Sequence, residues 1–145
     1  MPTDLGPLFP PGFTGMPPHM GSNDFSIWQR YHQIHGRDFL GFYFDAAVGL
    51  GAIIPDGTAE KLARTWTRLT QKRIDVIGIR KDAVWIIEVR DSAGTSALGA
   101  VLSYVHLLRN DNPFSLPLRM AVLTDHADRD MKAVMHDYGI QLIEI

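Results

Sequence analysis

Two neighbouring apolar segments, RIDVIGI at residues 73–79 and VWIIEVR at residues 84–90, decide the fold of this chain. Both have the length and the isoleucine- and valine-rich composition of buried β-strands, and the short segment between them fits a tight turn, so we predict a β-hairpin. Each strand carries one acid among its apolar residues, Asp75 in the first and Glu88 in the second. A carboxylate in a buried strand is stable only when it is paired, hydrogen-bonded or bound to a metal ion. The hairpin therefore predicts two acidic side chains close enough to share one divalent cation.

Length, charge and composition limit the class of protein. A chain of 145 residues, of which 46% are hydrophobic, fits one globular domain with a substantial core. The formal net charge of -2 argues against strong non-specific binding to nucleic acid but allows a local basic surface. The absence of cysteine excludes disulfides, thiolate nucleophiles and cysteine-ligated zinc. No apolar run reaches the roughly 20 residues that span a membrane, and the first residues lack the pattern of a signal peptide.

Residues 1–23 differ in composition from the rest of the chain, residues 24–145, which we assign to an α/β domain. Six of the nine prolines lie there together with four glycines, which argues against a helix or central strand and predicts an extended, polyproline-like arm. Apolar residues are spread through this arm, although a solvated linker does not need them: Leu5, Leu8, Phe9, Phe13, Met16 and Met20. Two interpretations remain open, a disordered tail or an arm that docks on another subunit.

The rest of the chain alternates between helical and strand patterns. Apolar spacing and turn residues predict the following elements: a helix that starts at an N-cap of Ser22 or Asn23 and ends before Gly36, helices over residues 58–69, 96–108 and from 125 or 126 to 138, and further strands over residues 42–48, 118–123 and 140–145. In the second helix, one stripe is formed by Leu62, Ala63, Trp66 and Leu69. The order of elements from residue 73 onward predicts a mixed central β-sheet flanked by helices on both faces.

The region around the two acids resembles the PD-(D/E)XK nuclease superfamily, which has the restriction-endonuclease-like fold. The similarity lies in Asp75, the hairpin, the sequence IEVR at residues 87–90 and the helix sequence ALGAVLSY at residues 97–104, which look like phage and RecB-type members. In architecture it extends over about residues 24–145. The site residues that this resemblance implies are Asp75, Glu88 and the carbonyl of Val89 as Mg²⁺ ligands, with Arg90 and Tyr104 as further catalytic residues. In such a site the metal polarises the scissile phosphate and activates water.

A purely structural role for the two acids remains open beside this resemblance. Asp75 can be neutralised by Arg73 or Arg90, and Glu88 by Arg90 or Arg80, without any metal ion. In that case the two carboxylates need only ion-pair partners that stabilise their charge in the apolar core.

Three departures from the family pattern indicate a degraded motif. Arg90 stands where the family has lysine, and its pKa above about 12 prevents it from acting as a base. Ala100 stands where RecB-type members carry a glutamine, four residues before the helix tyrosine. The first helix of the family usually supplies another acid, but residues 25–37 contain none and only Asp24 and Asp38 flank them.

Basic residues and histidines give weaker signals. The candidates for contact with nucleic acid are Lys61, Arg64, Arg68 and Lys72. Their spacing gathers them on one face, which either contacts DNA phosphates or is the solvated side of an amphipathic helix. His32 and His35 have a spacing that suits a metal ion, but no third ligand clusters with them.

Two functions follow, and the sequence leaves open whether the protein is an enzyme. The degraded motif and the apolar arm favour a bacteriophage virion or assembly protein of the neck, tail or capsid, built on an inactive nuclease-like fold without a cofactor. Its arm would bind other subunits in an oligomer or a larger assembly. The alternative is an active Mg²⁺-dependent deoxyribonuclease of phage recombination, packaging or restriction. In both cases we expect a protein of the virion or host cytoplasm, not secreted by a signal peptide.

Overall fold

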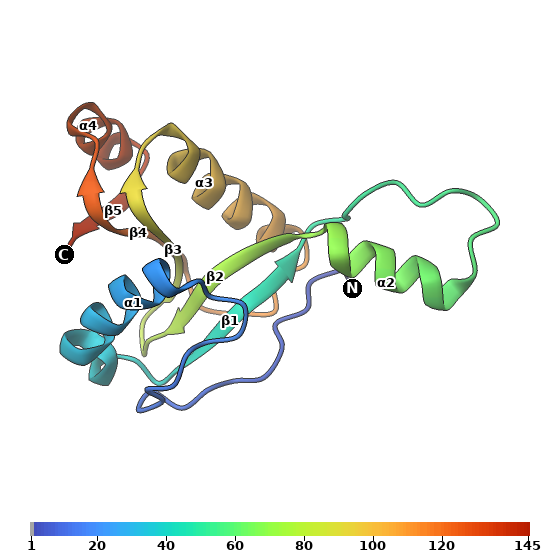
Figure 1. Cartoon of the computed structure of the whole chain (residues 1–145), viewed down its shortest axis with the longest axis horizontal. Helices are drawn as coiled ribbons and strands as arrows, with labels where there is room; N and C mark the ends of the chain where they lie inside the picture. Colours follow the sequence, from blue (N-terminus) through green and yellow to red (C-terminus); the bar gives the residue numbers. More distant parts are fainter. Residues whose placement is uncertain (1) are drawn as a thin grey trace.

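The computed structural model describes residues 2–145 (Figure 1). The elements are α1 (Ser22–His35), a short 3₁₀ turn η1 (Gly36–Asp38), β1 (Gly41–Val48), α2 (Glu60–Thr70), β2 (Lys72–Ile79), β3 (Val84–Ala93), α3 (Thr95–Asn110), β4 (Leu118–Ala127), α4 (Arg129–Asp137) and β5 (Ile140–Glu144). Every helix and strand expected from the sequence is present, with ends that differ by a few residues. Within residues 2–145, no helix is long and apolar enough to cross a lipid bilayer.

The five strands form one mixed sheet in the order β1-β2-β3-β4-β5. The neighbouring pairs β1–β2 and β2–β3 are antiparallel, whereas β3–β4 and β4–β5 are parallel. α3 and α4 connect the parallel neighbours, because a strand that returns in the same direction needs a crossover. The prediction of a mixed α/β sheet flanked by helices is confirmed, whereas the restriction-endonuclease-like identity stays a prediction.

Helices cover both faces of this sheet (Figure 1). On one face, Ile27 and Trp28 of α1 pack with aromatic residues of β1. On the other face, Val101 of α3 and Met135 of α4 belong to a separate apolar cluster. Because both faces are covered, a polar side chain in a central strand loses most of its contact with water.

In both β1 and β2, the alternation of side chains between the two faces of the sheet is broken at the same position. Residues two apart in a strand normally lie on the same face. Here two successive cross-strand pairs lie on opposite faces, the first with α1 and the second with α3: Phe44–Val76 and Ala46–Ile74. Between these pairs stand Asp45 of β1, whose φ is 56°, and Asp75 of β2. A left-handed residue in a strand bends the ladder and redirects side chains, so the irregularity falls at the acid of β2.

The N-terminal arm lies along the outer edge of β1 (Figure 1). Two isolated antiparallel bridges hold it there, Asp4–Ala47 and Phe9–Phe42. The ring of Phe9 packs edge-on against Phe44, with 5.2 Å between the ring centroids. An open sheet edge is a template for unwanted strand pairing, so the arm protects the sheet of its own chain. Docking of the arm on another subunit stays a prediction.

The helix α2 and the loop before it project from the end of the sheet (Figure 1). We call residues 49–71 the protrusion. The predicted helix is present, but none of its residues is buried. Leu62, Trp66 and Leu69 are 58%, 50% and 75% exposed. The apolar stripe predicted from their spacing is therefore open to solvent.

Candidate functional site

Asp75 and Glu88 lie opposite each other where the β2–β3 ladder ends. The last ladder pair on this side is Val76–Ile87, so the two acids are the next residues across from each other. Oδ2 of Asp75 accepts a hydrogen bond from the backbone N–H of Val89, the residue after Glu88, at 2.9 Å. Glu88 is only 2% exposed. The two acids therefore meet, as the hairpin predicted.

The carboxyl group of Glu88 holds a proton at neutral pH. Burial raises the pKa of Glu88 to about 9, and the hydrogen bond to Asp75 and the charge of Asp75 act in the same direction. The guanidinium of Arg90 acts against this rise without cancelling it. Two adjacent buried carboxylates do not both ionise unless a cation compensates their charge. Glu88 is therefore neutral in the absence of a further cation.

Arg90 reaches the edge of the acid pair from β3. Its Nε donates to Oε2 of Glu88 at 2.7 Å, and its Nη1 donates to Oγ of Ser96 at 2.9 Å. Ser96 lies in the first turn of α3, so the helix holds the guanidinium in place. The arginine side chain is 36% exposed. Arg90 thus contacts one acid directly and keeps part of its surface toward solvent.

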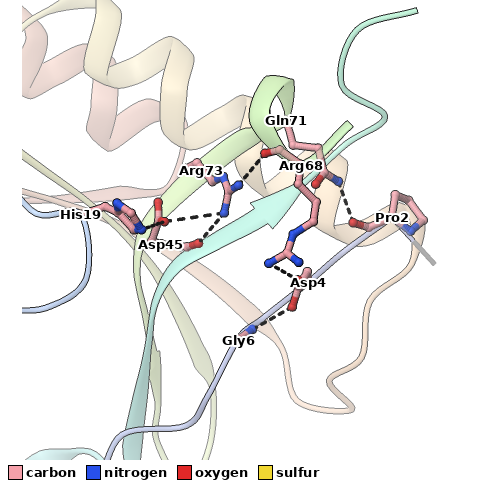
Figure 2. A network of polar contacts seen from close by, with 8 residues as sticks. All are labelled: Pro2, Asp4, Gly6, His19, Asp45, Arg68, Gln71 and Arg73. Atoms are coloured by element: carbon pink, nitrogen blue, oxygen red, sulfur yellow. Dashed lines mark hydrogen bonds and ion pairs between the residues drawn. The ribbon is translucent and has the colours of Figure 1, made fainter. Parts of the chain in front are cut away.

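The other two arginines considered as partners point elsewhere. Arg73 lies 3.6 Å from Oδ2 of Asp45 (Figure 2), and the guanidinium of Arg80 stacks 5.3 Å from the ring centroid of Phe39. Of the neutralising contacts expected from the sequence, the one between Arg90 and Glu88 is present.

Tyr104 of α3 lies within the electrostatic reach of both acids. Burial raises the pKa of Tyr104 well above its ordinary value, and the charges of Glu88 and Asp75 raise it further. The phenol therefore stays neutral and is available as a hydrogen-bond donor. Ala100, one turn earlier on the same helix, is partly buried and brings no polar group.

A third acid, Asp24 in the first turn of α1, is affected by the charges of the site. α1 begins at Ser22 with Gly21 as its N-cap, so Asp24 lies in the first turn of the helix. Burial raises the pKa of Asp24, and the charges of Asp75 and Asp91 raise it further. Asp24 therefore belongs to the first helix, whereas a role for it in the site stays a prediction. An acid in a first helical turn is stabilised by the helix dipole, which is the sequence signal that favours this earlier start.

The donor atoms of the acid pair suit magnesium. Among residues 2–145, no three acidic or histidine side chains come close enough together to hold a metal ion. Mg²⁺ does not require such a cage, because one or two carboxylates with carbonyl and water oxygens complete its octahedron. Asp75, Glu88 and the carbonyl of Val89 supply that donor set. The match between Mg²⁺ and this pair rests on the oxygen donors of the two side chains and on their negative charge.

Of the basic residues considered for nucleic-acid contact, Lys61, Arg64 and Arg68 lie on α2, and Lys72 is the first residue of β2, three residues before Asp75. Arg64 and Arg68 form ion pairs at 2.8 Å and 3.5 Å with acids of α2 and of the arm. Lys61 and Lys72 are exposed. The four residues therefore share an exposed region, and two of them are already paired.

A polar network fixes the base of the protrusion to the arm and the sheet (Figure 2). Gln71 is buried, and its Nε2 donates to the carbonyls of Pro2 and Gly49 at 2.7 Å each. Arg68 pairs with Asp4 of the arm at 3.5 Å. This role of Gln71 has no signature in the sequence, because its partners are backbone carbonyls far away along the chain.

The histidine pair on α1 has structural partners instead of a common ligand. Nε2 of His32 lies 2.6 Å from the carbonyl of Pro11, and Nδ1 of His35 lies 3.6 Å from Asp38. His32 thereby ties the arm to α1, so its spacing from His35 reflects packing.

Comparison with known proteins gives this chain no family. No family model, no curated protein and no solved structure matches it. Its class is therefore the one that fold and site define, an α/β protein with a mixed five-stranded sheet in which buried Glu88 faces half-buried Asp75 at the end of an antiparallel ladder. Membership of the PD-(D/E)XK superfamily stays a prediction.

Proposed function

We propose that the protein is a Mg²⁺-dependent nuclease whose active centre is the acid pair Asp75–Glu88. One observation carries the proposal: Glu88 is buried opposite Asp75 with its pKa raised to about 9, so the pair needs an added positive charge. A proton supplies that charge in the absence of metal. A divalent cation replaces the proton when both carboxylates act as ligands.

The residues of the chain have distinct roles in this proposal. Asp75, Glu88 and the carbonyl of Val89 hold the ion, which lowers the pKa of a bound water and stabilises charge on the phosphate. Arg90 is cationic at every physiological pH and partly exposed, so its guanidinium is suited to bind a phosphate oxygen. Tyr104 stays protonated and donates a hydrogen bond. Arg90 does not act as the general base, because arginine does not give up its proton.

The test is calorimetric titration of the folded protein with Mg²⁺ and Mn²⁺, followed by incubation with plasmid and linear DNA. The control is the double variant Asp75→Asn/Glu88→Gln, which keeps the shape of the pair and removes its charge. We expect metal binding and cleavage by the wild type and neither by the double variant. Cleavage that survives in the double variant would exclude the acid pair as the active centre.

A second candidate is the virion or assembly protein on an inactive nuclease-like fold. The contact of 2.7 Å between Nε of Arg90 and Oε2 of Glu88 favours it, because a guanidinium beside an acid pair takes up space and charge that a metal ion otherwise provides. Under this proposal the protein binds no Mg²⁺ and cleaves no DNA. The same titration therefore separates the two candidates.

A further inference from the structure

A hollow lies on the face of the sheet that α1 covers. It has a volume of about 260 Å³, and the strands β3, β4 and β5 supply its apolar and aromatic floor: Trp85, Ile87, Ala121 and Ile143. Ile87 directly precedes Glu88 in β3, so these two side chains point to opposite faces of the sheet. The hollow is therefore separate from the candidate active centre.

Polar side chains from three segments form one wall of this hollow. They are Tyr31 and His35 of α1, Asp38 of η1 and Arg80, which directly follows β2. His35 and Asp38 partner each other, with Nδ1 of the histidine 3.6 Å from Oδ2 of the acid. The groups of this wall that remain available to a ligand are therefore Tyr31 and Arg80.

The guanidinium of Arg80 has free hydrogen-bonding capacity. It stacks 5.3 Å from the ring centroid of Phe39 and, within residues 2–145, it is not engaged in an ion pair with an acid. A stacked guanidinium uses its flat face and keeps the N–H groups in its plane, which match a carboxylate in a bidentate geometry. The stacking on Phe39 thus fixes a cation at the wall and leaves its donors free.

The hydroxyl of Tyr31 is the second free donor. Tyr31 is only 9% exposed, and its hydroxyl has no hydrogen-bond partner among the described side chains and backbone groups. No fully buried polar side-chain atom of residues 2–145 lacks a partner, so this hydroxyl opens into the hollow that its side chain lines. Burial raises the pKa of Tyr31, so the hydroxyl keeps its proton and donates.

We propose that this hollow binds a small organic carboxylate with a flat apolar body. The body packs on Trp85 and on the aliphatic floor of the sheet, and the carboxylate accepts hydrogen bonds from Arg80 and Tyr31. Ligand sites commonly combine such an apolar lining with a few convergent polar groups. The site would work whether or not the acid pair is an active centre.

The charges of the wall favour a carboxylate over a phosphate. Arg80 supplies one positive charge without an acid partner, whereas Asp38 adds a negative charge at the same wall. A phosphate monoester carries about −1.5 to −2 charges at neutral pH and would lie beside Asp38. A carboxylate brings a single charge, which Arg80 matches.

The first test is calorimetric titration of the full chain with phenylacetate as the probe. Phenylacetamide has the same body without the charge, and phenyl phosphate has a larger charge, so both should bind more weakly. Arg80→Gln should lower the affinity for phenylacetate roughly tenfold, because a hydrogen bond to a charged group is lost. Tyr31→Phe should lower it by a smaller factor, because it removes one neutral donor. The matched control is Arg37→Gln, which removes an exposed arginine of η1 that does not line the hollow and should leave the affinity unchanged.

The second test locates the probe on the wild-type chain, so it does not depend on how well a variant folds. The indole N–H of Trp85 gives its own signal in proton–nitrogen NMR spectra, which Trp85→Phe identifies. This signal should shift on addition of phenylacetate, whereas the signal of Trp66 on the protrusion should stay in place. Circular dichroism verifies the folding of the variants used in the titration.

Three results would overturn the proposal. One is the absence of phenylacetate binding up to the solubility limit of the probe. Another is an affinity for phenylacetamide or phenyl phosphate that equals or exceeds the affinity for phenylacetate. The third is unchanged binding of phenylacetate by folded Arg80→Gln.

Discussion

The buried acid pair should make the fold less stable as the pH rises. The carboxyl of Glu88 has a pKa of about 9 in the folded chain against an ordinary value of 4.5. Between these two values the native state binds one more proton than the unfolded state, so the free energy of unfolding falls with pH by up to about 1.4 kcal/mol per pH unit. The contribution is fully present below the unfolded pKa and is lost as the pH rises toward the folded pKa. From pH 6 to pH 8.5 we expect a loss of about 3 kcal/mol from this group.

Urea unfolding of the wild type and Glu88→Gln at several pH values tests this prediction. A glutamine amide has the shape of the protonated carboxyl, can donate to Asp75 and can accept from Arg90, but it does not titrate. The variant should therefore lack this slope and should be more stable than the wild type at pH 8.5 by a few kcal/mol. Other titrating groups contribute equally to both proteins, so the difference isolates Glu88. Parallel curves for the two proteins would refute the assignment of the proton to this pair.

Three further predictions follow from the same geometry. Mg²⁺ should raise the melting temperature of the wild type more at pH 8.5 than at pH 6, because a larger fraction of Glu88 is already deprotonated at the higher pH. Asp75→Asn should show no such effect, and scanning calorimetry at both pH values measures the difference. Asp24→Asn should weaken Mg²⁺ binding several-fold, because it removes a charge that Asp75 feels; an unchanged affinity in calorimetry would place Asp24 outside the metal's field. Removal of residues 2–20 should cost several kcal/mol of stability, because it uncovers the edge of β1 and the aromatic cluster. Urea unfolding of the truncated chain gives that value, and undiminished stability would show that the arm contributes little to its own domain.

The mixed sheet with flanking helices could be predicted from the sequence because it depends on local patterns. The two strands on either side of residues 80–83 are apolar and short, and the segments after residue 95 alternate helix and strand with ordinary loop lengths. Right-handed crossovers and tight hairpins leave few ways to combine such elements into one sheet. The acids Asp75 and Glu88 were identified for the same reason, since each is a polar residue in an otherwise apolar strand.

The details that shape the site depend on contacts distant in sequence. The positive φ of Asp45 has no signature in the chain, because glycine, not aspartate, is the residue expected there. The start of α1 at Ser22 decides whether Asp24 lies inside the helix, and helix ends are uncertain by that many residues. Periodicity likewise identified the stripe on α2 but does not say what covers it.

The charges around Glu88 and Asp75 bear on the choice between an enzyme and an inactive scaffold. A guanidinium that fully replaces a metal ion would leave both carboxylates ionised, because one well-placed cation and the hydrogen bonds around it would then stabilise their charge. Instead Arg90 bonds to Glu88 and the pKa of Glu88 is still about 9. The nearby acid Asp24 adds negative charge to the same region. One arginine therefore compensates only part of the charge of the pair. Under the proposed nuclease function a divalent cation would supply the rest, so the raised pKa of Glu88 favours that proposal over the inactive scaffold.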